Sequence, residues 1–183
     1  FYRNKDKISK YSSFKSQMFH EKMISSSSLG IIGYGRIGSQ LAKYASKLGM
    51  KVFVYAPSKK ILNNKIKQTK RLDDLIKNSD FISNNISLNK KSYDFINKYF
   101  LKKMKKNSFL INTAKGHHLN IKDLLYFLEN KKIAGAAVDV YKNEDFNKIS
   151  EKKLLQNYIK KNDNLILTPH IAGATVQDRS YMQ

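Results

Sequence analysis

Three glycines near the start of the chain have a spacing that can bind an anion. Gly33, Gly35 and Gly38 form G-x-G-x-x-G directly after the apolar run 29–32. In this pattern the first glycine permits a tight turn from strand to helix, the second lets backbone approach a pyrophosphate, and the third lets helix and strand pack closely. Because a helix N-terminus presents unpaired N–H groups and a partial positive charge, the pattern predicts a dinucleotide-binding turn.

A strand and a helix must flank these glycines for the turn to work, and the sequence predicts both. Ile37, Leu41, Tyr44, Ala45 and Leu48 have helical spacing up to Gly49, and further apolar runs alternate with helical patterns along the chain. Strands that alternate with helices predict parallel pairing, so the expected fold is an α/β doubly wound parallel sheet of the Rossmann type. We expect strands at 29–32, 51–55, 80–83, 108–112, 133–140 and 165–167, and helices at 35–48, 72–76, 94–106 and 120–130.

The polar residues that follow these strands are the candidates for binding and catalysis. In a doubly wound sheet, ligands bind beyond the carboxyl ends of the strands. We therefore expect the segments after the predicted strands to meet at one edge of the sheet. These segments are 33–38, 56–60, Asn84 and Asn85, 113–116, 139–144 and 170–173.

Composition excludes several classes of function. The net charge is +21, but nearly all of the positive charge is lysine scattered along the chain, without a basic stripe interleaved with aromatic residues. We therefore expect no nucleic-acid partner. No apolar stretch has the length that spans a bilayer, so we expect no membrane partner. The chain has no cysteine, which excludes disulfides and thiolate chemistry and favours a reducing, cytoplasmic location.

Three further segments resemble the D-2-hydroxyacid dehydrogenase family, in the family's order behind the glycine turn. They are Ile111–Gly116 (INTAKG), Gly135–Tyr141 (GAAVDVY) and Thr168–Thr175 (TPHIAGAT). The resemblance implies an NAD(P)-binding Rossmann domain at 29–175, preceded by a linker and remnant of the interdomain region at 1–28. Residues 176–183 would begin the return to a substrate domain. On this interpretation the chain, which begins with Phe1 rather than Met, is a fragment that largely lacks its partner domain.

The resemblance also implies a catalytic trio and a reaction. His170 matches the family's acid/base histidine, and Glu144 matches the carboxylate that holds the imidazole and favours its protonated form. Lys115 stands where the family has an arginine that grips the substrate carboxylate. Since lysine offers a point charge instead of a planar fork, we expect slower turnover or a different preferred acid. His117 and His118 match no family role and are expected at the surface. The implied reaction is hydride transfer between NAD(P) and a small D-2-hydroxy or 2-keto acid, without a metal.

The choice between NAD and NADP stays open. Eighteen residues after Gly38, NAD-dependent members usually have an aspartate for the ribose hydroxyls, but this chain has Ala56. Ser58, Lys59 and Lys60 follow and could accept a 2′-phosphate. The expected cofactor-binding residues are Gly33, Gly35, Arg36, Ile37, Gly38, Ala56, Ser58, Lys59, Asn85, Thr113, Ala114, Asp139, Ala172 and Gly173.

A non-catalytic dinucleotide-sensing or scaffold protein on the same fold is the alternative, because a fold does not decide a function. His170 and Glu144 favour an enzyme, whereas Lys115 argues against one. The resemblance also implies a homodimer joined through the nucleotide domain.

Overall fold

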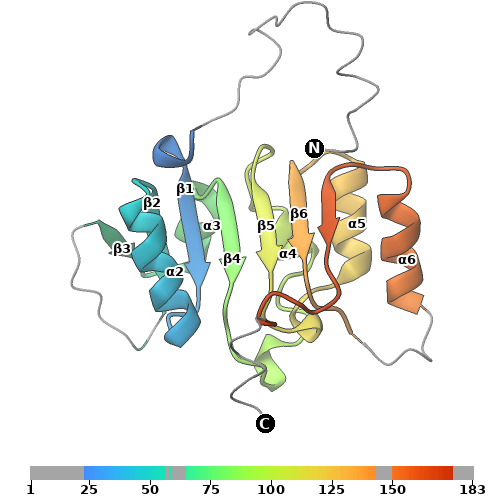
Figure 1. The fold of residues 1–183 in the computed structure, drawn as a ribbon, viewed down its shortest axis with the longest axis horizontal. Coiled ribbons are helices and arrows are strands. Elements are labelled where there is room, and N and C mark those ends of the chain that lie inside the picture. Colours follow the sequence, from blue (N-terminus) through green and yellow to red (C-terminus); the bar gives the residue numbers. More distant parts are fainter. Residues whose placement is uncertain (1–22, 57, 59–64, 143–149, 175–183) are drawn as a thin grey trace, which may run out of the picture.

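The sheet has seven parallel strands in the order β3-β2-β1-β4-β5-β6-β7, as the computed structural model shows (Figure 1). The structure describes residues 23–56, 58, 65–142 and 150–174. The first strand, β1, lies inside the sheet. Strands β2 and β3 lie on one side of it, and β4 to β7 follow in order on the other side. This strand order confirms the predicted α/β doubly wound parallel sheet.

The strands and helices lie close to their expected positions in most of the described chain. The strands are β1 (Ser28–Ile32), β2 (Lys51–Tyr55), β3 (Ile66–Gln68), β4 (Phe81–Asn84), β5 (Phe109–Asn112), β6 (Gly135–Val138) and β7 (Leu165–Leu167). The α-helices are α2 (Arg36–Lys47), α3 (Leu72–Asn78), α4 (Lys98–Leu101), α5 (Ile121–Glu129) and α6 (Ser150–Ile159). Short 3-10 helices are η3 (Ile24–Ser26), η4 (Lys90–Ser92) and η5 (Gly116–His118).

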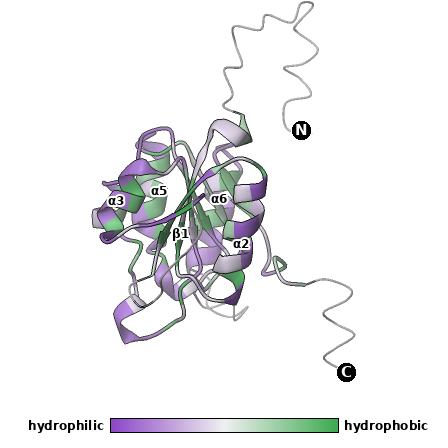
Figure 2. Cartoon of the chain, turned by 90° about the vertical axis from the view of Figure 1, so that its left-hand side faces the viewer, coloured by the Kyte–Doolittle hydropathy of each residue, from purple (hydrophilic) through white to green (hydrophobic). Residues whose placement is uncertain are grey.

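Two hydrophobic clusters bury the two faces of the sheet. Successive side chains of a strand point to opposite faces, and in β1 this places Ile31 in the cluster under α2 and Ile32 in the larger one. The larger cluster also contains buried side chains of α3, α4, α5 and α6. Figure 2 shows α3 and α5 on one side of the sheet and α2 on the other. The sheet is therefore held between helical layers, and its strand ends stay available.

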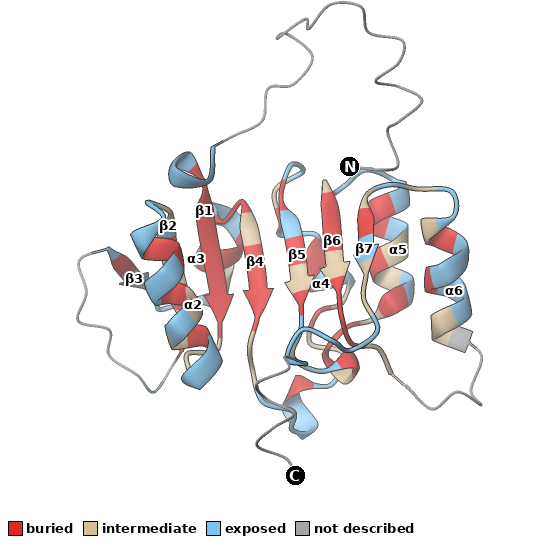
Figure 3. Cartoon of the chain, in the orientation of Figure 1, coloured by how far each residue is buried: buried red, intermediate tan, exposed pale blue. Residues whose placement is uncertain are grey.

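The buried side of α2 is made of small residues, not of the apolar stripe that predicted the helix. Gly38, Ala42, Ala45 and Ser46 are its buried residues, whereas most of the stripe faces solvent. Figure 3 shows this outward side as exposed. Small residues let the helix pack close to β1 and β2, which pushes the larger side chains outward. The exposed fractions are 74% for Ile37, 59% for Tyr44 and 61% for Leu48.

Three elements differ from the expectation. Strand β3 and helix α6 were not predicted, and the helix expected over 94–106 is reduced to α4. It begins late because the Asn97 side chain accepts hydrogen bonds from the N–H groups of Tyr99 and Phe100, which caps the helix there. Asp94 has a φ of 46°, which no helix allows, and Ile96 instead pairs with Leu119 in a parallel bridge. Within the described ranges, no helix combines the length and the apolarity that crossing a lipid bilayer requires.

Candidate functional site

The glycine turn between β1 and α2 has the shape of an anion-binding cradle. Gly33 has a φ of 93°, which favours glycine. A Cβ on Gly38 would lie 2.1 Å from the Gly33 carbonyl oxygen, so only glycine lets the helix approach the strand this closely. A Cβ on Gly35 would have no heavy atom within 4 Å, so the space in front of the helix is open. Among the described residues no side-chain hydrogen bond caps the first turn of α2, and its N–H groups are left to face this space. The turn therefore fits a dinucleotide pyrophosphate.

The end of β2 offers few polar groups within the described residues. Ala56 is buried, and its carbonyl oxygen accepts a hydrogen bond from the Gln68 side chain. Ser58 is exposed, while Lys59 and Lys60 lie outside the described residues. The methyl group of Ala56 cannot bind ribose hydroxyls.

A turn anchored to β5 carries Lys115. The Asn112 side chain holds this turn from behind, because its Oδ1 accepts from the Ala114 N–H at 3.4 Å and its Nδ2 donates to the Lys115 carbonyl at 3.2 Å. Thr113 and Lys115 are exposed, so the held backbone presents both side chains to the sheet edge. An ammonium group on a fixed backbone can bind a carboxylate, as the sequence predicts for Lys115.

Gly116 joins this turn to the segment that follows β6. A Cβ on Gly116 would lie 2.1 Å from the Tyr141 carbonyl carbon and 2.5 Å from the Lys142 nitrogen. The backbone of 141–142 therefore packs directly against the residue after Lys115. Glu144, the predicted carboxylate partner of the histidine, lies two residues further on and outside the described residues.

Asp139, at the end of β6, holds the turn that carries His170. Its Oδ1 accepts from Thr168 Oγ1 at 2.5 Å and from the Ile171 N–H at 2.9 Å, and its Oδ2 accepts from the Ala172 N–H at 3.0 Å. The His170 N–H donates to the Asp139 carbonyl at 2.9 Å. With these four bonds, His170 is kept at a φ of 54°, a conformation that non-glycine residues rarely adopt. The side chain of His170 is exposed at the sheet edge.

These hydrogen bonds also change the acidity of Asp139. Burial of the carboxyl group opposes its ionisation, but the hydrogen bonds from Thr168, Ile171 and Ala172 and the nearby His170 outweigh burial. The pKa of Asp139 is therefore below its usual value. The sequence identified Asp139 as a cofactor-binding residue; in the structure both of its oxygens already accept hydrogen bonds within the chain.

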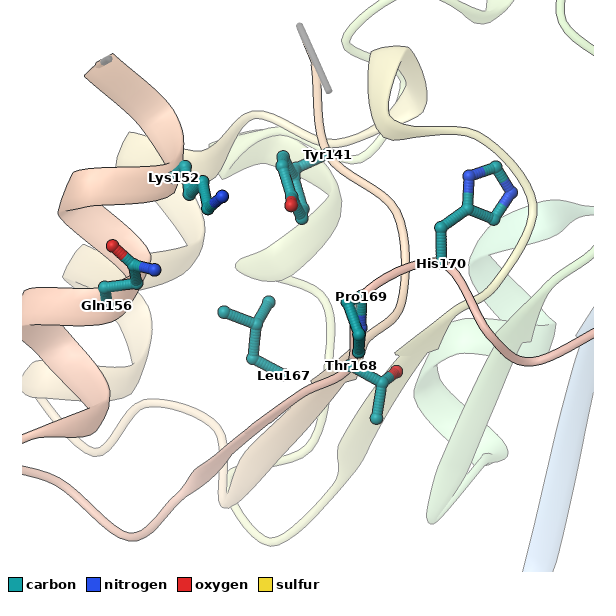
Figure 4. Close-up of a pocket in the computed structure, with 7 residues that line it drawn as sticks. All are labelled: Tyr141, Lys152, Gln156, Leu167, Thr168, Pro169 and His170. Carbon is teal, nitrogen blue, oxygen red and sulfur yellow. The ribbon is translucent and has the colours of Figure 1, made fainter. Parts of the chain in front are cut away.

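A pocket of about 460 Å³ lies between α6 and the segment that ends at His170. Its lining combines the α6 side chains Lys152 and Gln156 with Tyr141 and the segment 167–170. Figure 4 shows Lys152 and Gln156 on α6 beside Tyr141, and His170 across from them beyond Pro169. The pocket shares none of its lining with the glycine turn. It therefore does not correspond to the cofactor site that the sequence predicts.

One residue that was expected at the surface is fully buried. His118 is 0% exposed, and its Nδ1 lies 3.0 Å from the Asn84 side-chain nitrogen. His117 is half-buried, with its ring edge-on to Tyr93 at 5.2 Å between centroids. The surface prediction was wrong for His118, because η5 turns its side chain inward behind the Lys115 turn. The sequence signal that could have found it is the pair of polar residues Asn84 and Asn112 at the ends of two neighbouring strands. When such residues are buried, they need a polar side chain nearby, and His118 is that side chain.

The structure thus brings together the ends of three neighbouring strands. β5 pairs with β6, and β6 pairs with β7. Asp139 and the 141–142 backbone, which both follow β6, contact the His170 turn on one side and the Lys115 turn on the other. The remaining predicted cofactor residues follow the strand ends as well. Arg36, Ile37, Ala172 and Gly173 are exposed, and Ala114 and Asn85 are half-buried.

Comparison with known proteins gives a family match over most of the chain. Residues 2–172 match the model of the D-isomer specific 2-hydroxyacid dehydrogenase family, NAD binding domain. A glyoxylate reductase from Thermococcus litoralis is 38% identical over 156 residues, which cover 84% of this chain and 45% of that protein. The chain spans about half the length of the curated relatives it matches.

Solved structures have the same fold. The D-lactate dehydrogenase from Aquifex aeolicus, in complex with NAD and lactic acid, has a TM-score of 0.86 and 33% identity over 97% of this chain and 56% of that one. An acyclic imino acid reductase in complex with NADPH and D-Arg has a TM-score of 0.78 and 26% identity, covering 98% of this chain and 54% of that one.

Proposed function

Because this chain belongs to the D-isomer specific 2-hydroxyacid dehydrogenase family, we propose that it is the nucleotide-binding part of an NAD(P)-dependent oxidoreductase. The substrate is a small D-2-hydroxy acid or the corresponding 2-keto acid. One observation carries the proposal: the open glycine cradle, the Lys115 turn and the His170 turn all follow strand ends at the same edge of one sheet. The side chains of Asn112 and Asp139 fix the Lys115 and His170 turns through backbone groups of these turns.

We assign the cradle to the pyrophosphate of the cofactor. The N–H groups at the start of α2 would bind the phosphate oxygens, and Gly35 leaves the space that these oxygens need. A bound nicotinamide supplies or accepts the hydride, which is chemistry that the cofactor brings with it. The segment 113–114 and residues Ala172 and Gly173 would position the nicotinamide end.

The catalytic roles are divided between His170, Lys115 and Glu144. The His170 imidazole exchanges a proton with the oxygen on the substrate C2, and Glu144 orients the ring and stabilises its charged form. The Lys115 ammonium binds the substrate carboxylate and polarises the neighbouring carbonyl. The contacts of Asp139 support the role of His170, since they fix the backbone that carries it.

Both nicotinamide cofactors are candidates, and NAD is favoured by the family description, NAD binding domain. NADP is supported by Ala56, which puts no carboxylate near a 2′-phosphate, and by the NADPH complex of a related reductase. We infer that the preference for one of the two is set by Ser58 and the lysines after it. Titrating NADH and NADPH against the fluorescence of the chain measures that preference.

The domain division and the assembly are proposals too. We assign residues 29–175 to the nucleotide domain, 1–28 to the linker and 176–183 to the return toward a substrate domain. We propose a homodimer, since Ile37 and Tyr44 on α2 and Leu48 at its C-cap expose apolar side chains that a second copy can bury. The absence of cysteine fits a cytoplasmic location.

An assay of NADH and NADPH oxidation tests the proposal. The chain together with its substrate domain is mixed with glyoxylate, hydroxypyruvate, pyruvate and phosphohydroxypyruvate, and absorbance at the nicotinamide band is followed. Turnover of at least one acid, lost in His170→Gln, supports the enzyme. Tight binding of the cofactor without turnover of any acid supports the alternative, a dinucleotide-sensing protein.

A further inference from the structure

Three buried polar side chains lie directly behind the Lys115 turn. Asn84, Asn112 and His118 are each 0% exposed, and they come from β4, β5 and η5. Buried polar groups are almost always hydrogen-bonded, because an unpaired one loses its hydration without compensation. The partners of these three side chains therefore show what the cluster holds in place.

The backbone groups around the cluster determine the orientation of both amides. A carbonyl oxygen only accepts, so the Asn112 atom 3.2 Å from the Lys115 carbonyl is the donor Nδ2. Asn112 Oδ1 then accepts from Asn84 Nδ2 at 3.0 Å. Asn84 Nδ2 gives its second hydrogen to His118 Nδ1, also at 3.0 Å. His118 Nδ1 must therefore be an acceptor, which assigns the ring proton to Nε2.

The hydrogen bonds close on themselves. The backbone N–H of His118 donates to the same Lys115 carbonyl, at 3.2 Å, that Asn112 Nδ2 reaches. The path runs from the His118 ring through Asn84 and Asn112 to Lys115 and back to the His118 backbone. We call this closed path the 84–112–118 circuit. It meets the turn that carries Lys115 at the Lys115 carbonyl, which accepts two of its hydrogen bonds.

The protonation state of His118 agrees with this assignment. Burial opposes the charged ring and lowers the pKa of His118, and His117 and Lys115, both cationic when protonated, act in the same direction. A hydrogen bond with the Ser87 backbone acts in the opposite direction but does not outweigh burial. Apart from Ser87, no described residue offers the buried Nε2 a hydrogen-bond partner. A neutral ring with an accepting Nδ1 is the form that the circuit needs.

We propose that His118 is a positioning residue, which through the 84–112–118 circuit fixes the backbone of residues 113–115 and so directs Lys115 to the substrate carboxylate. This inference rests on the proposed function, in which Lys115 binds the substrate. His118 touches neither substrate nor cofactor, and it acts only through the turn. Its neighbour His117 contacts Tyr93 outside the circuit and serves as the matched control.

The first test reads the tautomer directly. In the chain labelled with ¹⁵N-histidine, two-dimensional NMR at pH 7 should show one imidazole with a protonated Nε2 and an unprotonated Nδ1, and this signal should vanish in His118→Asn. The backbone amides of Ala114 and His118 should exchange slowly with deuterium. A His118 ring protonated at Nδ1, or on both nitrogens, would overturn the circuit.

The second test compares two substitutions in the protein that includes the substrate domain. His118→Asn places an acceptor near the position of Nδ1, whereas His118→Leu removes the acceptor and leaves an Asn84 hydrogen unpaired. We expect His118→Leu to lower kcat/KM for the 2-keto acid roughly tenfold, with a smaller effect on the Kd of NADH. His118→Asn should keep most of the activity, and His117→Leu should match the parent.

The outcomes separate this inference from the proposed function. Full activity in His118→Leu, or equal losses in His118→Asn and His118→Leu, would overturn the positioning role. If the parent protein reduces no 2-keto acid, the proposed function fails, and the exchange rate of the Ala114 amide in His118→Leu then decides whether the circuit holds the turn. If His118→Leu does not fold, the tautomer and the activity of His118→Asn decide it.

Discussion

Replacing Asp139 with asparagine removes a charge from the turn that carries His170 and nearly preserves its shape. In the parent, one oxygen of Asp139 accepts from Thr168 Oγ1 and Ile171 N–H, and the other accepts from Ala172 N–H. An asparagine has a single oxygen, so its NH₂ group must face at least one of these donors. If the asparagine oxygen keeps the bonds from Thr168 and Ile171, its NH₂ group faces the Ala172 N–H, and two donors then meet without an acceptor.

The size of the effect follows from the bonds that are lost. A hydrogen bond to a charged group contributes about 1.5–3 kcal/mol, and Asp139→Asn loses one while making the others neutral. We therefore expect the free energy of unfolding to fall by about 2–3 kcal/mol. At 1.4 kcal/mol per factor of ten, the same loss confined to the turn makes its open form roughly 30- to 140-fold more frequent. Asp139 is only 3% exposed, so solvent does not screen this loss.

The loss should depend on pH in a defined direction. The pKa of Asp139 is lowered in the folded chain, so the ionised carboxyl stabilises the fold above about pH 4, the ordinary aspartate value. This contribution disappears as the pH falls below that value through the lowered pKa. The stability difference between the parent and Asp139→Asn should therefore be full at pH 7 and shrink in acid.

Urea denaturation followed by circular dichroism measures the stability of both proteins from pH 7 downward. Asp74→Asn, which removes an exposed carboxylate from α3, is the matched control and should change stability by less than about 0.5 kcal/mol. Deuterium exchange at the amides of Ile171 and Ala172 shows whether the turn itself opens. If Asp139→Asn unfolds at the same urea concentration as the parent and keeps these amides protected, the proposed anchoring of His170 is wrong.

Further changes test the cradle, the lysine and the α2 surface. Gly38→Ala puts a Cβ 2.1 Å from the Gly33 carbonyl, so the turn must shift and the Kd of NADH by fluorescence should rise at least about tenfold; an unchanged Kd speaks against the cradle. Lys115→Arg replaces a compact ammonium with a planar guanidinium that can bind the substrate carboxylate through two parallel N–H groups, and it should raise kcat/KM on the preferred 2-keto acid; unchanged or lower rates on every acid tried contradict the role of Lys115. Leu48→Lys places a charge on a residue that is 61% exposed and should shift sedimentation toward the monomer at an unchanged unfolding midpoint; a variant that stays dimeric excludes this side of α2 as the interface.

Local sequence patterns predicted most of the fold, and the errors have local causes. The strand at 66–68 has only three residues, Ile-Lys-Gln, which is too short for a periodic pattern. The helix α6 contains mostly polar residues, and its main buried side chains are Leu155 and Tyr158. The expected helix over 94–106 failed because Asn97 caps a new start and Asp94 leaves the helical region. Apolar periodicity indicates which residues lie on the same face of a helix or strand. Capping side chains and backbone pairing decide at which residue the element begins.

The sequence predicted the residues with chemical roles at the candidate site, but not the residues that hold them in place. Segments at strand ends identified Lys115 and His170, whose roles remain predictions. The sequence did not indicate that Asp139 uses both oxygens to hold the His170 turn. It also assigned His118 to the surface, although its buried Nδ1 lies 3.0 Å from the side-chain nitrogen of Asn84, a residue 34 positions earlier in the chain.

The order of glycines, apolar runs and polar strand ends determined the parallel sheet, the anion-binding turn and the edge at which the chemistry is expected. Such features depend on neighbours within a few positions, so they can be read along the chain. Only the tertiary structure decided which side of α2 is buried, that His118 is buried beside Asn84, and what Asp139 holds. These depend on contacts between residues that are far apart in the sequence, and only the packing of the strands with one another and with the helices brings those residues together.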